Sequence, residues 1–127
     1  MSIRPTLALT ELAAAAALTA CSSASSGAAD LGSGTPAAVA LVATKDGCAP
    51  APATLPAGPM TFTIRNDNAP AVSEVELMKG SKILGEKENL IPGKTASFSL
   101  RLAAGTYTVY CPGATTDKAT FVVTAAS

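Results

Sequence analysis

Three cysteines, Cys21, Cys48 and Cys111, are the side chains of this sequence with the greatest capacity for chemistry. A thiol can be acylated, paired in a disulfide, or ionised to a thiolate that binds metals. The 127-residue chain contains no histidine, and so lacks the commonest general base and the commonest transition-metal ligand. No Ser/His, Cys/His or paired-carboxylate arrangement stands out either. We therefore expect a protein that is not an enzyme.

The first cysteine follows a segment that is typical of an export signal. Residues 1–20 start with a positive charge at Arg4 and continue into an alanine-rich apolar run, with Glu11 as its one charged residue. Residues 18–21, Leu-Thr-Ala-Cys, resemble the bacterial lipobox, whose cysteine is acylated and becomes the mature N-terminus. The resemblance implies that Cys21 anchors the protein in the membrane, on its extracytoplasmic face, because each buried methylene contributes about 0.8 kcal/mol.

A linker and one folded domain are expected after the signal. Residues 21–37 begin with the lipidated cysteine and consist mostly of Ser, Ala and Gly, which predicts a flexible tether. Residues 38–127 are long enough for one modest core. The nine basic and nine acidic residues of the whole chain balance, so its charge does not favour nucleic acid as a partner.

Cys48 and Cys111 remain as a pair once Cys21 is assigned to lipidation, which also explains an odd number of cysteines in an exported protein. Outside the cytoplasm, paired cysteines are usually oxidised, so a disulfide is one interpretation. It would close a loop of roughly sixty residues and contribute about 4 kcal/mol in the chain-entropy model. The other interpretation is a pair of thiolates that bind a metal ion.

The elements that would position this pair are strands. Short runs rich in Val, Thr, Phe and Ile alternate with Pro and Gly, and in residues 61–65 the alternation predicts Phe62 and Ile64 inward. The other predicted strands are 39–44, 74–77, 82–85, 98–102, 106–111 and 119–124, with turns at 79–81, 92–93 and 104–105. About seven short strands at regular spacing favour an all-β Greek-key sandwich. Functional residues usually lie in the loops at the ends of such a fold.

Several segments, by their order and spacing, resemble those of one family with this fold. Leu-Pro-Ala-Gly at 55–58 leads into the strand at 61–66, and Gly105 starts a late strand that ends at Cys111, as in cupredoxins. The segments 46–48, 73–74, 91–93 and 105–113 together resemble the cupredoxin-like domain of EfeO-type iron-uptake lipoproteins. The resemblance covers residues 39–123 and implies a cupredoxin-like sandwich.

The resemblance also implies a site. In that family two cysteines and a glutamate are proposed to bind a metal, and Cys48, Glu74 and Cys111 occupy the matching positions. Iron or copper is the implied ion, with Asp46 or Asp117 as a fourth ligand. A blue-copper centre is excluded because it needs two imidazoles. Full-length family members also carry a helical domain with a His-x-x-Glu motif, which we do not expect here because the chain has no histidine.

Two functions of different classes follow from these alternatives. The first is a lipid-anchored, extracytoplasmic cupredoxin-like protein that binds a metal ion or assists a metal-uptake system. Its implied partners are a metal-uptake permease or a separate helical metal-binding protein. The second is a structural or protein-interaction sandwich that is cross-linked by a disulfide and holds no metal.

Overall fold

A computed structural model describes residues 34–127, and all regular secondary structure in this range is β-strand. The expected signal, the lipidation at Cys21 and most of the expected tether lie outside the described residues. Within residues 34–127, no helix has the length and hydrophobicity needed to span a bilayer.

The described part of the chain contains nine strands, of which two are only two and three residues long. They are β1 (Ala37–Ala43), β2 (Pro50–Ala51), β3 (Thr54–Pro56), β4 (Gly58–Asn66), β5 (Val75–Lys79), β6 (Lys82–Lys87), β7 (Thr95–Leu102), β8 (Gly105–Tyr110) and β9 (Lys118–Thr124). The strands beyond the expected seven are β2 and β3. The first strand begins at Ala37, two residues before the expected start.

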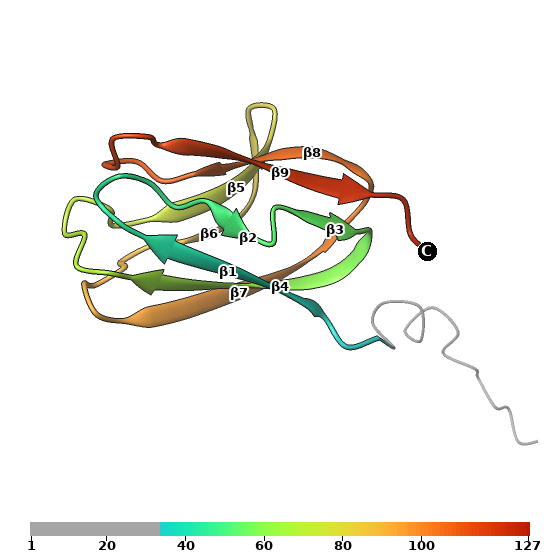
Figure 1. The fold of residues 1–127 in the computed structure, drawn as a ribbon, viewed down its shortest axis with the longest axis horizontal. Helices are drawn as coiled ribbons and strands as arrows, with labels where there is room; N and C mark the ends of the chain where they lie inside the picture. The colour runs from blue at the N-terminus through green and yellow to red at the C-terminus, as the bar shows by residue number, and fades with distance from the viewer. Residues whose placement is uncertain (1–33) are drawn as a thin grey trace, which may run out of the picture.

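The strands form two sheets that face each other as a sandwich (Figure 1). One sheet has the order β2-β1-β4-β7 and the other β3-β9-β8-β5-β6. The pairs β1–β4 and β3–β9 are parallel, whereas the remaining pairs are antiparallel. This arrangement confirms the predicted all-β sandwich.

The core lies between the two sheets and follows the alternation of the sequence. In β4 the side chains of Met60, Phe62 and Ile64 are fully buried. Phe62 stacks on Phe98 of β7 with 5.2 Å between ring centroids, and meets the ring of Phe121 edge-on across the sandwich at 5.5 Å. Burying one such side chain contributes about 1.5–3 kcal/mol, so this aromatic contact holds the two sheets together.

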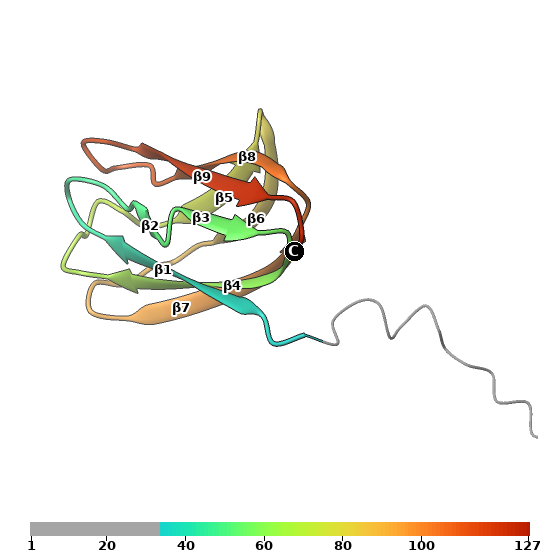
Figure 2. The ribbon, with the colours of Figure 1, turned by 45° about the vertical axis from the view of Figure 1, so that its right-hand side comes forward.

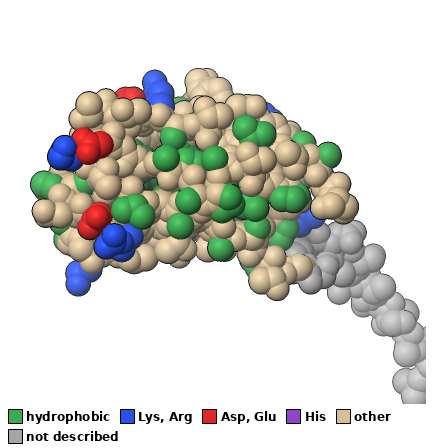
Figure 3. Space-filling view, viewed as in Figure 1, with side chains coloured by type: hydrophobic (Ala, Val, Ile, Leu, Met, Phe, Trp, Pro, Cys, Tyr) green, Lys and Arg blue, Asp and Glu red, His purple; other side chains and the backbone are tan. Residues whose placement is uncertain are grey.

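The connections at the two ends of the sandwich differ in length. Four segments, 44–49, 67–74, 88–94 and 111–117, gather at one end, on the left in Figures 1 and 2. We call this the loop end. The described chain enters at the opposite end, where the C-terminus also lies (Figure 2). The connections there are short, at residue 57 and at residues 80–81 and 103–104. On the face drawn in Figure 3, most charged side chains gather toward the loop end.

Candidate functional site at the loop end

Cys48 and Cys111 meet at the loop end and form a disulfide. Their Cα atoms are 6.5 Å apart, although 63 positions separate them in the sequence. Cys111 follows β8 directly and is fully buried, while Cys48 lies between β1 and β2 and is 4% exposed. The bond therefore ties a connection of the four-stranded sheet to the residue that follows a core strand, β8, of the other sheet. The predicted disulfide is confirmed.

A hydrogen-bonded turn shapes the segment before Cys48. The Thr44 hydroxyl accepts hydrogen bonds from the backbone N–H groups of Asp46 and Gly47, both at 3.2 Å, and donates one to the Gly47 carbonyl at 3.0 Å. Threonine suits this role because its hydroxyl can bond to nearby backbone and so stabilise a turn. The turn delivers Cys48 to its position beside Cys111.

Backbone hydrogen bonds then join this turn to segment 111–117. The N–H groups of Thr115 and Thr116 donate to the carbonyls of Lys45 and Asp46, both at 2.9 Å. Gly47 makes the close approach possible, because a Cβ added there would lie 3.1 Å from the Thr116 carbonyl oxygen. The disulfide is thus one of several links between the two segments.

Asn66, the last residue of β4, holds the other two segments of the loop end, and it is completely buried. Its amide nitrogen donates to the carbonyls of Ala69, Val72 and Leu90 at 3.0–3.1 Å. Its amide oxygen accepts the Ala69 N–H at 2.8 Å. Asn66 was not among the predicted site residues, and its one signal in the sequence is a polar side chain at the end of a strongly alternating strand.

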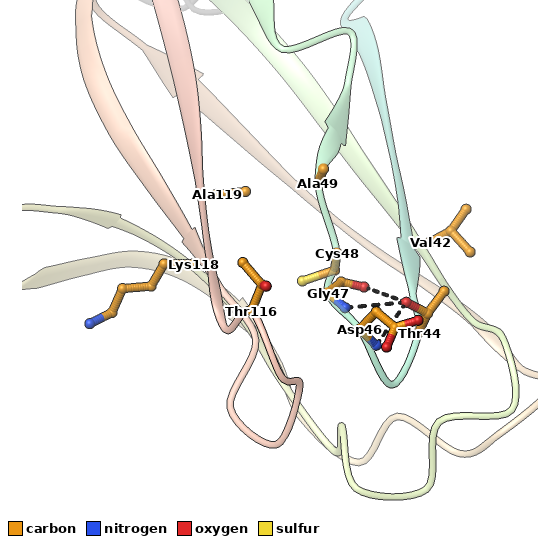
Figure 4. A pocket seen from close by; sticks show the side chains of 9 residues that line it. All are labelled: Val42, Thr44, Asp46, Gly47, Cys48, Ala49, Thr116, Lys118 and Ala119. Atoms are coloured by element: carbon orange, nitrogen blue, oxygen red, sulfur yellow. Dashed lines mark hydrogen bonds between the residues drawn. The ribbon is translucent and has the colours of Figure 1, made fainter.

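A cavity of about 410 Å³ opens beside the disulfide, and we call it the Cys48 cavity. It lies between the segment that follows β1 and the start of β9 (Figure 4). Its walls are Val42, Thr44, Asp46, Gly47, Cys48, Ala49, Thr116, Lys118 and Ala119. Figure 4 shows the Cys48 sulfur between the two walls, pointing toward the side that carries Thr116. Most of these side chains are small, and Cys48 lines the cavity although only 4% of its surface is exposed.

Glu74 lies at the same end, immediately before β5, and is half-buried. Its neighbour Glu76 is only 9% exposed, although Val75 and Leu77 fill the core side of β5 and Glu76 must therefore face outward. Burial raises the pKa of the Glu76 carboxyl above its ordinary value, and three neighbouring carboxylates raise it further. These neighbours are Glu74, Glu86 and Glu88. The loop-end half of β5 and β6 is therefore acidic.

The structure brings together only part of the predicted metal-ligand set. Cys48 and Cys111 are joined, but a disulfide sulfur is not the thiolate that binds a metal. Asp46 is largely exposed and pairs with Lys45 at 2.9 Å, while the Asp117 carbonyl accepts the Cys111 N–H at 2.7 Å. Among residues 34–127, no three cysteine, aspartate or glutamate side chains are grouped closely enough to hold a metal ion. The metal site with Glu74 stays a prediction, and it concerns the reduced chain.

The residues directly after Cys111 leave no room for a side chain at Gly113. Gly113 has a φ of 96°, and a Cβ added there would collide with the Ala71 carbonyl oxygen. Segments 67–74 and 111–117 are therefore packed backbone to backbone. Pro112, Gly113 and Ala114 carry no side-chain group that could bind a metal.

Comparison with known proteins agrees with this geometry. A family model described as a cupredoxin-like domain matches residues 11–123, which is nearly the whole chain. This chain belongs to the cupredoxin-like domain family. The assignment fits the two-sheet sandwich and a late strand, β8, that is followed directly by Cys111 at the loop end.

The curated relatives that match this chain are named as iron-uptake components. The iron uptake system component EfeO of Yersinia pestis is 32% identical over 80 residues, which are 63% of this chain and 21% of the relative. The protein of the same name from Escherichia coli strain K12 is 32% identical over 85 residues, or 67% and 22% of the two chains. The chain thus spans about a fifth of the length of these relatives, and the match confirms the predicted resemblance.

Solved structures support the fold alone. Auracyanin B superposes with a TM-score of 0.58 at 23% identity, covering 76% of this chain and 95% of the auracyanin. Auracyanin from the photosynthetic bacterium Roseiflexus castenholzii gives a TM-score of 0.52 at 18% identity, covering 72% and 98%. Both likenesses fit the cupredoxin-like sandwich.

Proposed function

We propose that this chain is a lipid-anchored, extracytoplasmic cupredoxin-like protein that binds iron or copper, or assists a metal-uptake system, at its loop end. The observation that carries the proposal is the meeting of Cys48 and Cys111 at this end of a domain whose relatives are named iron-uptake components. Glu74 lies at the same end, before β5. The acidic neighbourhood of Glu74 and Glu76 would also attract a cation.

Reduced Cys48 and Cys111 would hold the ion as thiolates, with Glu74 as the third ligand and Asp46 or Asp117 as the fourth. Thiolates favour soft ions such as copper(I) and also bind iron, whereas a carboxylate adds preference for harder ions. Because iron or copper would be the cargo of such a protein, no enzymatic step is needed. A metal-uptake permease or a separate helical metal-binding protein would receive the ion.

The test compares metal binding by reduced and oxidised protein under anaerobic conditions. Iron(II) and copper(I) are titrated separately into the full chain carrying Cys21→Ser, so that only Cys48 and Cys111 can supply thiols. We expect binding of about one ion by the reduced protein and much weaker binding by the oxidised protein, because ligation needs thiolates. Equal, negligible binding of both ions in both states would refute the metal proposal.

Two glutamate variants test the third ligand. Glu74→Gln is expected to weaken metal binding to the reduced protein by about 10-fold or more, because a neutral amide replaces an anionic ligand. Glu88→Gln is the matched control, since it removes the same charge from the same acidic neighbourhood at an exposed position that is not a predicted ligand. Equal losses in both variants would show that Glu74 contributes only long-range charge.

The second candidate is a protein-interaction domain that is cross-linked by the disulfide and carries no metal. The observation in its favour is the disulfide itself, together with the lack of a grouped ligand set in residues 34–127. A thiol titration of the denatured, unreduced protein exported by a bacterial host separates the candidates. The cross-linked domain is favoured if Cys48 and Cys111 supply no reactive thiol. The metal site is favoured if they supply two.

A further inference from the structure

We propose that the Cys48 cavity is a thiol-exchange site, at which the thiolate of a small, peptide-borne cysteine attacks the Cys48 sulfur and opens the disulfide. The proposal goes beyond metal binding, because exchange would occur whether or not the released thiols then hold an ion. It rests on an asymmetry between the two sulfur-bearing residues. Cys48 lines a cavity, whereas Cys111 does not line it and is fully buried.

The two cysteines also differ in how firmly they are held. Cys111 is anchored where β8 ends, and its N–H donates to the Asp117 carbonyl at 2.7 Å. Cys48 lies outside the regular strands, between the Thr44 turn and the two-residue strand β2. Attack at Cys48 would therefore leave the core strand undisturbed. Cys111 has no exposed surface, so an incoming thiolate could not reach it without displacing neighbouring residues.

The cavity has the dimensions and walls that this reaction needs. Thiol–disulfide exchange proceeds by attack of a thiolate on one sulfur while the other sulfur leaves, so the attacking group needs access from one side of the bond. A volume of about 410 Å³ accommodates a cysteine-sized side chain. Gly47, Ala49 and Ala119 line it and leave space beside the Cys48 sulfur (Figure 4).

The electrons of the exchange balance, because the protein disulfide is itself the oxidant. The incoming thiolate forms a new bond to the Cys48 sulfur, the Cys48–Cys111 bond breaks, and its electron pair stays on Cys111 as a thiolate, which then takes up a proton. A second thiol that attacks the mixed disulfide releases Cys48 and leaves the thiol reagent as its own disulfide. Two electrons pass from the two incoming thiols to the protein disulfide.

The direct test locates the first site of attack. The full chain carrying Cys21→Ser and an intact disulfide is incubated briefly with reduced glutathione in the absence of denaturant, and free thiols are then blocked by alkylation. Trypsin places Cys48 in the peptide 46–65 and Cys111 in the peptide 102–118, so mass spectrometry distinguishes them. We expect glutathione on Cys48 and the alkyl group on Cys111, with about a tenfold or greater preference. Equal labelling, or glutathione mainly on Cys111, would overturn the proposal.

Two alanine variants show whether the cavity controls the reaction. Ala49→Leu adds three carbons at the cavity wall and is expected to slow the formation of the Cys48 adduct by about fivefold or more, because access limits exchange. Ala40→Leu makes the same change at an exposed position of β1 that does not line the cavity, and its rate should match that of the parent protein. Equal rates in both variants would contradict the proposal.

A urea series distinguishes attack on the folded protein from attack after unfolding. Exchange through the cavity should be nearly independent of urea well below the unfolding transition, since no large surface is exposed. A rate that rises with urea as steeply as global unfolding would mean that both sulfurs react only in the unfolded chain. That result would also overturn the proposal.

Discussion

The two ends of the sandwich keep their connections in place by different means. At the loop end, four segments of six to eight residues are held by a disulfide, a buried amide and bonds between backbones. At the opposite end, the strands are joined by connections of only one or two residues, and the link described there is the hydrogen bond from the Tyr107 hydroxyl to the Ala103 carbonyl. Long segments expose polar backbone that cannot pack by hydrophobicity alone, so specific polar and covalent links act there beside the core side chains Ala69, Val72 and Leu90.

The difference between the two ends of the sandwich also explains why the candidate site lies at the loop end. Strands fix the ends of each long segment, and the links then set how the segments approach one another. Cys48 and Cys111 belong to this linking system and are, at the same time, the residues with the capacity for chemistry. Changes at the loop end should therefore affect stability more than matched changes at the opposite end.

The largest expected effect is loss of the disulfide. Cys48→Ser with Cys111→Ser should lower the free energy of unfolding by about 4 kcal/mol, because the bond closes a loop of 63 positions in the unfolded chain. Urea denaturation of parent and variant, both carrying Cys21→Ser, measures the loss. Reduction of the parent is the control and should lower stability by a similar amount. A loss of less than about 1 kcal/mol would show that the hydrogen bonds hold the loop end without the disulfide.

How far the sequence predicts the structure depends on which contacts decide each feature. The alternation in β4 and β9 predicts their buried faces, because it reports a local period of two residues. The short strands β2 and β3 have no such period and form only because neighbouring strands offer them hydrogen bonds. The cysteine pair is predictable from residue count and compartment.

The remaining features of the site depend on how separate segments approach each other. Asn66 is buried only because segments 67–74 and 88–94 converge on its amide. The Cys48 cavity exists only because segment 44–49 lies against the chain before β9. Neither approach leaves a periodic pattern in the sequence. The sequence therefore predicts where the strands lie, but it does not predict how the segments between them pack.

The second largest effect is expected at Asn66. Asn66→Ala would leave the Val72 and Leu90 carbonyls and the Ala69 N–H without their partner, whereas the Ala69 carbonyl keeps the Val72 N–H. It should lower the free energy of unfolding by about 3 kcal/mol. The matched change at the opposite end is Tyr107→Phe, which removes one hydrogen bond to the Ala103 carbonyl and should cost about 1 kcal/mol. Urea denaturation gives both values. Equal losses would remove the distinction between the two ends.

Two glycines with positive φ provide a smaller contrast. Gly113→Ala should lower the free energy of unfolding by about 2–3 kcal/mol, because it adds a collision with the Ala71 backbone to the strain of a positive φ. Gly80→Ala, in the hairpin turn at the opposite end, has a φ of 60° and open space around the added Cβ. It should cost only about 1 kcal/mol. Thermal melts of both variants check the difference, and a larger loss for Gly80→Ala would contradict the backbone packing at the loop end.

The smallest effect distinguishes the two ends of one hairpin, β5–β6. Near the loop end Glu76 lies opposite Glu86, whereas at the turn Lys79 pairs with Lys82 and its ammonium lies 5.3 Å from the Tyr107 ring centroid. Because the folded state raises the pKa of Glu76, its ionised form destabilises that state. While Glu76 is neutral, it does not lower the free energy of unfolding. The full stability is therefore present below the pKa that Glu76 has in the unfolded chain, and part of it is lost as the pH rises through the higher pKa that Glu76 has in the folded chain.

Glu76→Gln should therefore raise the free energy of unfolding at pH 7 by about 0.2–1 kcal/mol, the scale of a like-charged cross-strand pair. The gain should vanish when the pH falls below the ordinary range of a glutamate carboxyl, because Glu76 is then neutral in both states. Glu88→Gln, at an exposed position of the same acidic neighbourhood, should gain less. Urea denaturation at pH 7 and pH 3 measures these differences. A gain for Glu76→Gln that stays constant between the two pH values would mean that side-chain packing, and not charge, sets the effect.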